Sequence, residues 1–331
     1  MFKPTVAFIG LLSLFVLSLY PVSASFADQK PASASLLRHY LKGSYYVGQE
    51  RFDKALPEFQ HARDIDPQSL YIRLKIAGVL VHLGKIAQAE KELEAAKKIE
   101  PDQIDPYLAL VFLYAYTNDD EKLEKEFEAF LKKASEVKPG DPKILGYLAQ
   151  FYYQKHRLPE ALQIYQKITQ ADPADFEGMF WAGYIYEEMG RRTDAIAAWE
   201  QTLKVNPAYG PALNSLGYIY AEEGINLDKA ETMIVKALNL EPDNGAYLDS
   251  LGWVYFKKKD YKRSRKYLEK AALYIKDPVV YVHRGDLAEA AGDAAAAVKY
   301  YQEGLKAFPD NEDLLKKIKA LDGKKDQIHQ R

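Results

Sequence analysis

Histidines and closely spaced carboxylates are the side chains of this chain that could carry catalysis or bind a metal. No histidine belongs to an HExxH motif or to another close ligand pair, and the six are assigned to separate segments or to the tail. Cysteine is absent, which excludes a thiolate nucleophile and a cysteine-ligated metal. The histidines are His39, His61, His82, His156, His283 and His329.

Two glutamate pairs, Glu187-Glu188 and Glu222-Glu223, resemble the paired carboxylates of hydrolases. Adjacent side chains on one helix diverge by about 100°, so neither pair can face one substrate. No phosphate-binding glycine loop, GxGxxG motif or GxSxG elbow occurs. We therefore expect no catalytic residue, no cofactor and no metal site.

A repeated pattern predicts the elements that carry these side chains. Alanine, or once leucine and once serine, recurs at intervals of 33 to 38 residues, and prolines end most of the segments. Proline cannot continue a helix, so the chain turns there into the next unit. The recurring positions are Ala55, Ala89, Leu123, Ala161, Ala195, Ala230, Ser264 and Ala297.

Short motifs fall in the same register. The second helix of one unit reads Ala55-x3-Phe59-x2-Ala62, and two first helices read Leu216-Gly217-x2-Tyr220 and Leu251-Gly252-x2-Tyr255. A small residue at the glycine position allows close approach of the paired helices. This pattern resembles the tetratricopeptide-repeat (TPR) family over about residues 36–321. The resemblance implies an all-α, right-handed α-solenoid of about eight helix-turn-helix units.

The register predicts the domain organisation. Repeats begin near Leu36, Leu70, Ile104, Pro142, Phe176, Gly210, Gly245 and Pro278. The predicted divisions are a linker over 28–35, eight repeats over 36–310, a capping helix over 311–321 and a polar tail over 322–331. The third repeat gains four residues, about one helical turn, within 124–137.

The N-terminus has the features of a cleavable signal peptide over residues 1–27. Lys3 precedes an apolar run from Thr5 to Tyr20, and small residues follow up to Ala27. The apolar run is short for a membrane span, which makes an uncleaved anchor the less favoured alternative. We expect export to the periplasm or the cell exterior, with no stable membrane insertion after cleavage.

Composition and one segment narrow the class of partner. A net charge of −2 gives no general attraction to nucleic acid. Residues 214–256 resemble a block found in TPR proteins of the bacterial cell envelope, some of which resemble adaptors for proteases or wall-modifying enzymes. The resemblance implies a protein partner, either a peptide segment or an envelope enzyme.

The family resemblance also implies a concave groove lined by the first helix of each repeat. At the groove positions of repeats four to seven, aromatic residues predominate, with amide and carboxyl groups among them. The same rings could instead pack between helices, although the groove positions that carry most of them are hard to bury. The predicted partner-binding residues are Tyr153, Phe180, Tyr184, Asn214, Tyr218, Asp249, Trp253 and Phe256.

A basic turn follows this surface in repeat seven, where Asp260 is the one acidic residue within the segment. Such a charge density could attract an anionic polymer, lipid head groups or an acidic protein patch, or it could be an ordinary solvated turn. The basic residues are Lys257, Lys258, Lys259, Lys262, Arg263, Arg265 and Lys266.

The sequence therefore predicts a non-catalytic, exported scaffold or adaptor that binds a protein partner in an aromatic groove. Two alternatives remain open. One is an assembly component of an envelope export system for polysaccharide, pili or outer-membrane proteins. The other is a carbohydrate-binding solenoid that stacks sugars on its tyrosine and tryptophan rings.

Overall fold

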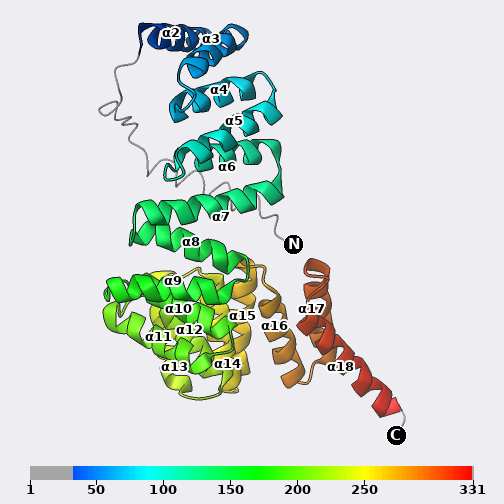
Figure 1. Cartoon of the computed structure of the whole chain (residues 1–331). Coiled ribbons are helices and arrows are strands. Elements are labelled where there is room, and N and C mark those ends of the chain that lie inside the picture. The colour runs from blue at the N-terminus through cyan, green and yellow to red at the C-terminus, as the bar shows by residue number, and fades with distance from the viewer. Residues whose placement is uncertain (1–32, 330–331) are drawn as a thin grey trace. The chain divides into compact units, whose positions relative to one another are not determined.

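The structure, a computed structural model, describes residues 33–329, with side chains up to Leu321. The predicted signal peptide (1–27) and most of the predicted linker (28–35) lie outside the described residues. Every regular element of residues 33–329 is an α-helix, which confirms the predicted all-α fold (Figure 1).

The chain divides after Lys133 into two compact units. Unit 1 contains three helix pairs, except for the last residues of α7, which belong to unit 2. These are α2 (Ala34–Gly48), α3 (Phe52–Ile65), α4 (Leu70–His82), α5 (Ile86–Ile99), α6 (Asp105–Thr117) and α7 (Asp120–Val137).

Unit 2 contains five further helix pairs and a last helix. Each first helix packs against its own second helix, and α12 and α14 also pack against the first helix of the next repeat. The helices are α8 (Pro142–Gln154), α9 (Leu158–Ala171), α10 (Phe176–Glu188), α11 (Arg192–Val205), α12 (Gly210–Glu222), α13 (Leu227–Leu240), α14 (Gly245–Lys257), α15 (Tyr261–Tyr274), α16 (Pro278–Ala290), α17 (Ala294–Ala307) and α18 (Glu312–His329).

The first helices begin where the sequence signals a start. The side chains of Asp141, Asp175 and Asn244 accept hydrogen bonds from the first backbone amides of α8, α10 and α14. These amides lack a partner within their own helix, so a side-chain acceptor stabilises each helix start by about 1 kcal/mol. Capping therefore fixes the register that carries the groove residues.

Glycine in the first helix allows a large side chain of the second helix to lie against its backbone. A Cβ atom at Gly183 would come within 2.5 Å of the Trp199 indole, and one at Gly285 within 2.1 Å of the Tyr301 ring. Trp199 and Tyr301 are both buried. The proposed reason for a small residue at this position therefore holds in the structure.

Many tyrosines pack against a basic side chain at the turn between paired helices. The guanidinium of Arg157 lies 4.2 Å from the Tyr152 ring centroid, and Arg263 lies 4.2 Å from that of Tyr255. A cation over an aromatic face is worth roughly 0.5–1 kcal/mol at a partly exposed site. These contacts account for tyrosines that have no place in the groove.

Two departures from a regular array occur at α7 and α18. Helix α7 has 18 residues where α5 has 14, in agreement with the extra turn predicted within 124–137. Helix α18 covers the end of the core with Leu314 and Leu321. It continues to His329, so the backbone of the predicted polar tail is helical beyond Leu321, where the capping helix was predicted to end.

Candidate functional site

Repeats four and five place a cluster of rings on their first helices. The Tyr153 ring centroid is 5.9 Å from those of Trp181 and Tyr184, and the Phe180 centroid is 6.4 Å from that of Tyr184. Tyr184 is 39% exposed, whereas Phe180 is 8% exposed and also packs against Tyr209. The structure thus brings three predicted residues together and leaves Tyr184 the most accessible.

A second cluster spans repeats six to eight. The Trp253 ring is stacked on Phe256 and on His283, with centroid distances of 4.5 and 4.0 Å, and the Tyr218 centroid is 6.2 Å from His283. The indole N–H donates a hydrogen bond to Glu222. These side chains come from α12, α14 and α16, so the clustered rings span three consecutive repeats.

Burial corrects one premise of the sequence prediction. Positions expected to be hard to bury carry Phe180, Asp249 and Trp253, which are only 8, 5 and 6% exposed. Neighbouring repeats cover them, as the Trp253 stack illustrates. Tyr153, Asn214, Tyr218 and Phe256 are partly exposed. Of the eight predicted residues, these four and Tyr184 are the ones that a partner could reach directly.

Polar atoms beneath the second cluster are incompletely satisfied. Oδ2 of Asp249 lies 2.8 Å from Nδ1 of His283, and both side chains are buried. Oδ1 of Asp249 and Oδ1 of Asn214 are buried atoms without a hydrogen-bond partner. A buried acceptor without a donor costs about 1–3 kcal/mol. Because both atoms are buried, a bound molecule could reach them only if the surrounding side chains moved.

Sequence reasoning treated the histidines as isolated, and this interpretation is wrong for three of them. His283 belongs to the second cluster, and His39 lies beside His61 in the same repeat, with a ring centroid distance of 5.1 Å. The chain separation of the residues hid these contacts, because helix packing joins them. Only the assignment of residues to helix faces within a shared repeat could have indicated the pairing of His39 with His61.

Negative charges surround the ring clusters. Glu188 accepts a hydrogen bond from the Tyr153 hydroxyl, and burial together with this contact raises the pKa of Tyr153. Burial, followed by the charges of Glu222 and Asp249, likewise raises the pKa of Tyr218. Both phenols are therefore neutral donors near neutral pH.

Two cations moderate this acidic character, and one of them is Lys257, whose Nζ lies 5.0 Å from the Trp253 ring centroid. Arg192 forms an ion pair with Glu187 at 2.6 Å and lies 3.8 Å from Glu223. Glu222 and Glu188 have no ion pair among the side chains that the structure describes. The margin of the clusters therefore keeps a net negative charge.

The basic turn is more strongly compensated than its sequence indicated. Lys258 pairs with Asp228 and Glu231, and Arg263 lies 3.6 Å from Glu231 as well as beside Asp260. Asp260 is therefore not the one opposing acid, since α13 supplies two more. Lys257 donates a hydrogen bond to the backbone carbonyl of Glu222, so a further cation of the turn is engaged within the fold.

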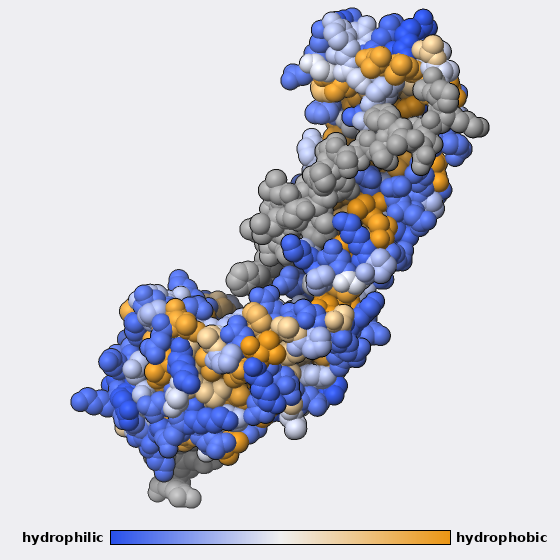
Figure 2. Space-filling model, turned by 90° about the vertical axis from the view of Figure 1, so that its left-hand side faces the viewer, coloured by the Kyte–Doolittle hydropathy of each residue, from blue (hydrophilic) through white to orange (hydrophobic). Residues whose placement is uncertain are grey.

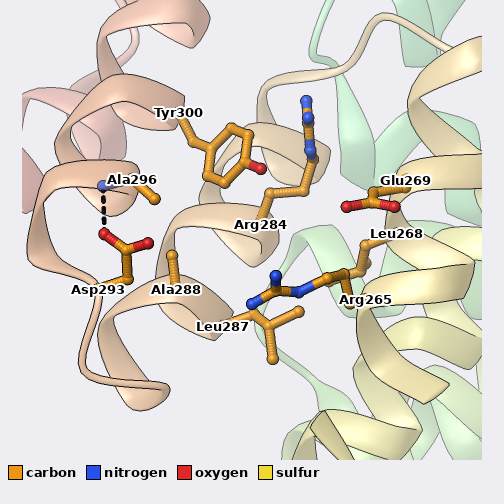
Figure 3. A pocket seen from close by; sticks show the side chains of 9 residues that line it. All are labelled: Arg265, Leu268, Glu269, Arg284, Leu287, Ala288, Asp293, Ala296 and Tyr300. Atoms are coloured by element: carbon orange, nitrogen blue, oxygen red, sulfur yellow. Dashed lines mark hydrogen bonds between the residues drawn. The ribbon is translucent and has the colours of Figure 1, made fainter. Parts of the chain in front are cut away.

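The other basic side chains of the turn are Lys259, Lys262, Arg265 and Lys266, all exposed. Arg265 lines a small cavity of about 120 Å³ between α15, α16 and α17 (Figure 3). Arg284 lines the same cavity, lies 4.1 Å from the Tyr300 ring centroid and has a buried Nε without a hydrogen-bond partner. The predicted basic patch is thus reduced to four exposed cations, of which Arg265 lines this cavity.

Hydrophobic residues on the face of unit 2 drawn in the lower part of Figure 2 lie in patches between hydrophilic ones. Unit 2 therefore presents mixed surfaces on which apolar contact and hydrogen bonding can be combined, as protein interfaces require. Among the described residues, no helix is both long enough and apolar enough to span a membrane.

Comparison with known proteins places this fold in a family. Models of the tetratricopeptide repeat match residues 46–111, 128–178, 182–226, 246–277 and 279–311. The chain therefore belongs to the TPR family, whose helical arrays serve as protein-interaction scaffolds.

Particular relatives share parts of this array. Human protein O-mannosyl-transferase TMTC1 is 30% identical over 118 residues, which are 36% of this chain and only 13% of that protein. The Cut9–Hcn1 hetero-tetramer of the APC/C has a chain with 18% identity and a TM-score of 0.55, covering 86% of this chain and 55% of that one. A TPR protein from Parabacteroides merdae has 15% identity and a TM-score of 0.45, covering 87% and 98%.

Proposed function

We propose that this chain is an exported, non-catalytic scaffold that binds an extended segment of a protein partner along the ring clusters of repeats four to eight. The binding surface is the set Tyr153, Tyr184, Asn214, Tyr218 and Phe256, supported from below by Phe180, Asp249 and Trp253. Its role would be to hold a partner near an envelope enzyme, which raises their effective concentration without new chemistry.

The observation that carries this proposal is the run of accessible rings on three consecutive first helices. Tyr153 on α8 and Tyr218 on α12 are partly exposed, and Tyr184 on α10 is exposed. An extended peptide offers side chains at regular intervals, so it can contact successive repeats in turn.

The charges favour a segment that contains lysine or arginine. Glu188 and Glu222 lie at the ring clusters, and each already accepts a hydrogen bond from an aromatic donor. A cation in the segment would gain further charge-assisted hydrogen bonds there. It would also be drawn toward the negatively charged margin before contact, which speeds association.

Two other ligand classes are less well supported. A sugar cannot stack on Trp253, because Phe256 and His283 already cover that ring and it is 6% exposed. An anionic polymer at the basic turn would meet fewer free cations than the sequence contains, since Lys257, Lys258 and Arg263 are engaged within the fold.

Export rests on the pattern of residues 1–27, and an envelope role rests on the resemblance of residues 214–256 to envelope adaptors. Within that compartment, recruitment of a protease or wall hydrolase is our first proposal. Assembly of an export system is the alternative, and it uses the same binding surface. The two differ in the identity of the partner and not in the mode of binding.

Selection of displayed random peptides against the full chain tests the proposal. We expect enrichment of segments with basic and aromatic residues, which bind more weakly by about tenfold or more to the Tyr184→Ala, Tyr218→Ala double variant.

Tyr274→Ala is the matched control, since Tyr274 is 50% exposed on α15. It should leave peptide affinity unchanged, and circular dichroism should show the same helix content in all variants. Equal binding to the double variant and to the control would exclude the ring clusters as the binding surface.

A further inference from the structure

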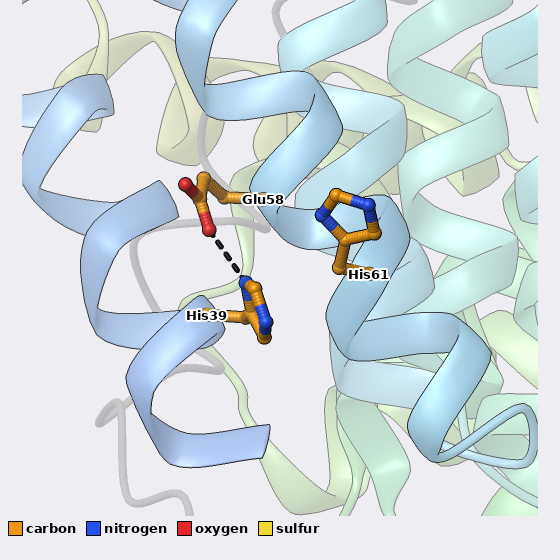
Figure 4. A group of neighbouring side chains, drawn as sticks. All are labelled: His39, Glu58 and His61. Carbon is orange, nitrogen blue, oxygen red and sulfur yellow. Dashed lines mark hydrogen bonds and ion pairs between the residues drawn. The ribbon is translucent and has the colours of Figure 1, made fainter. Parts of the chain in front are cut away.

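Three side chains that can bind a metal meet in the first repeat, far along the chain from the ring clusters. His39 lies on α2, and Glu58 and His61 lie on α3 (Figure 4). Glu58 and His61 are three residues apart on one helix, so they share a face and point toward α2. Packing of the helix pair supplies the third group, His39.

The geometry is compact. Nδ1 of His39 is 2.6 Å from Oε2 of Glu58, and the ring centroids of His39 and His61 are 5.1 Å apart. One ligand atom from each of the three residues lies within 4.8 Å of the others. Ligands of a tetrahedral ion at about 2.0–2.2 Å lie about 3.4 Å apart. His39 and Glu58 must therefore separate slightly to admit an ion, and rotation of exposed His61 can bring the third ligand closer.

The environment permits an ion to enter. The side chains of His39 and Glu58 are each 18% exposed, and His61 is exposed. Lys42 lies 3.5 Å from Oε1 of Glu58, but its side chain is 55% exposed and can turn to solvent when a cation binds. A simple hydrogen bond between His39 and Glu58 would not require a second imidazole beside it.

The ligand types select the metal. Two imidazoles and one carboxylate match the His₂Glu set that holds Zn²⁺ with a fourth position open, whereas Mg²⁺ and Ca²⁺ prefer oxygen ligands. We propose that His39, Glu58 and His61 form a site for a divalent transition metal of the Zn²⁺ type. The ion fastens α2 to α3, and water or a group from another molecule fills the fourth position.

A bound ion would stabilise α2, because this helix buries few of its side chains. Gly43 is the one buried residue of α2, while Leu37, Leu41 and Tyr45 are at least half exposed. Within residues 33–329, the first repeat has a neighbouring repeat on one side, so its outer helix is held more weakly than inner helices. An ion that binds only the folded repeat stabilises it by mass action.

Titration of the untagged full chain with ZnCl₂, followed by calorimetry, tests the site, with Co²⁺ absorption as a report of ligand geometry. We expect one bound ion and slower hydrogen exchange of α2 and α3 amides when Zn²⁺ is present. Mg²⁺ should produce neither effect. Substitution of one ligand should weaken Zn²⁺ binding by more than about tenfold.

His39→Ala and His61→Gln are the ligand variants, and His61→Gln is expected to fold because His61 is exposed. His156→Asn is the matched control, since it removes one histidine elsewhere at a positive φ that asparagine tolerates. Binding that survives in both ligand variants, or no Zn²⁺ binding by the folded wild-type chain, would overturn the proposal. Loss in the ligand variants with retention in the control supports it.

Discussion

Glycine at one position of the first helix decides how closely the paired helices approach. Gly285 lies against the ring of Tyr301, whose hydroxyl donates to Asp286 at 2.6 Å and holds the ring in place. By contrast, a Cβ atom at Gly146 of α8 would meet nothing within 4 Å. The two glycines therefore separate the effect of close packing from that of helix propensity.

We expect Gly285→Ala to lower the free energy of unfolding by about 1–3 kcal/mol, because the added methyl group overpacks a fixed ring. Gly146→Ala should raise it by about 0.5–1 kcal/mol, because alanine is the better helix former. Urea unfolding followed by circular dichroism measures both. Equal effects of the two substitutions would contradict the packing role of Gly285.

Alkaline pH should reveal a buried phenol in repeat seven. Tyr255 donates a hydrogen bond to Glu231 at 2.7 Å, and burial, followed by this contact, raises the pKa of Tyr255 from 10.0 to about 12. The folded state therefore favours the neutral form of the Tyr255 phenol. Its contribution to stability is complete below pH 10 and is lost as pH rises through about 12.

Unfolding experiments across this pH range, with ultraviolet absorbance reporting tyrosinate, measure the effect. Tyr255→Phe should make the alkaline loss of stability shallower, because the variant has one phenol fewer to deprotonate on unfolding. A variant whose stability falls as steeply as that of wild type would show that Tyr255 does not contribute.

At the scale of elements, helix α18 ends the core of unit 2. Leu314 is fully buried against the last repeat, whereas its neighbour Leu315 is 38% exposed. Leu314→Ala should destabilise the chain by about 2–5 kcal/mol through loss of apolar contact and formation of a cavity. Leu315→Ala should change the stability by less than about 1 kcal/mol.

Thermal unfolding of the two leucine variants compares them directly. Hydrogen exchange adds a local measure, since Leu314→Ala should speed exchange in α17 and α18 before other helices of unit 2. Similar melting temperatures for the two variants would mean that α18 does not cap the core.

The helices could be predicted from the sequence because local signals specify them. Helices α4, α8, α10, α12, α14 and α16 start at the residues that the repeat register assigned as repeat beginnings. Proline at the first helical position and capping residues such as Asp141 are readable without tertiary information. The end of α18 was misplaced, because a polar segment gives no apolar periodicity.

The candidate site was less predictable, since contacts between repeats decide it. Trp253 was expected to be open to a partner, and His283 from the following repeat covers it. The compensation of Lys258 by Asp228 and Glu231 depends on α13 in the preceding repeat. Residue types indicated which groups could act, but only the packed helices show which remain accessible.

For the whole molecule, we propose that binding takes place on the first helices of unit 2. Ring clusters and a negatively charged margin coincide there, whereas the cations of the basic turn are partly neutralised. Residues on the second helices, such as Tyr274, are at least as exposed but lie outside the ring clusters. The proposed function therefore depends on where a bound segment lies.

Photo-cross-linking tests that claim most directly. A benzophenone amino acid is placed at Tyr184 in one variant and at Tyr274 in another, and each is irradiated with the same selected peptide. The account predicts peptide adducts at position 184 and none above background at position 274. Adducts at 274 without adducts at 184 would contradict binding along the ring clusters.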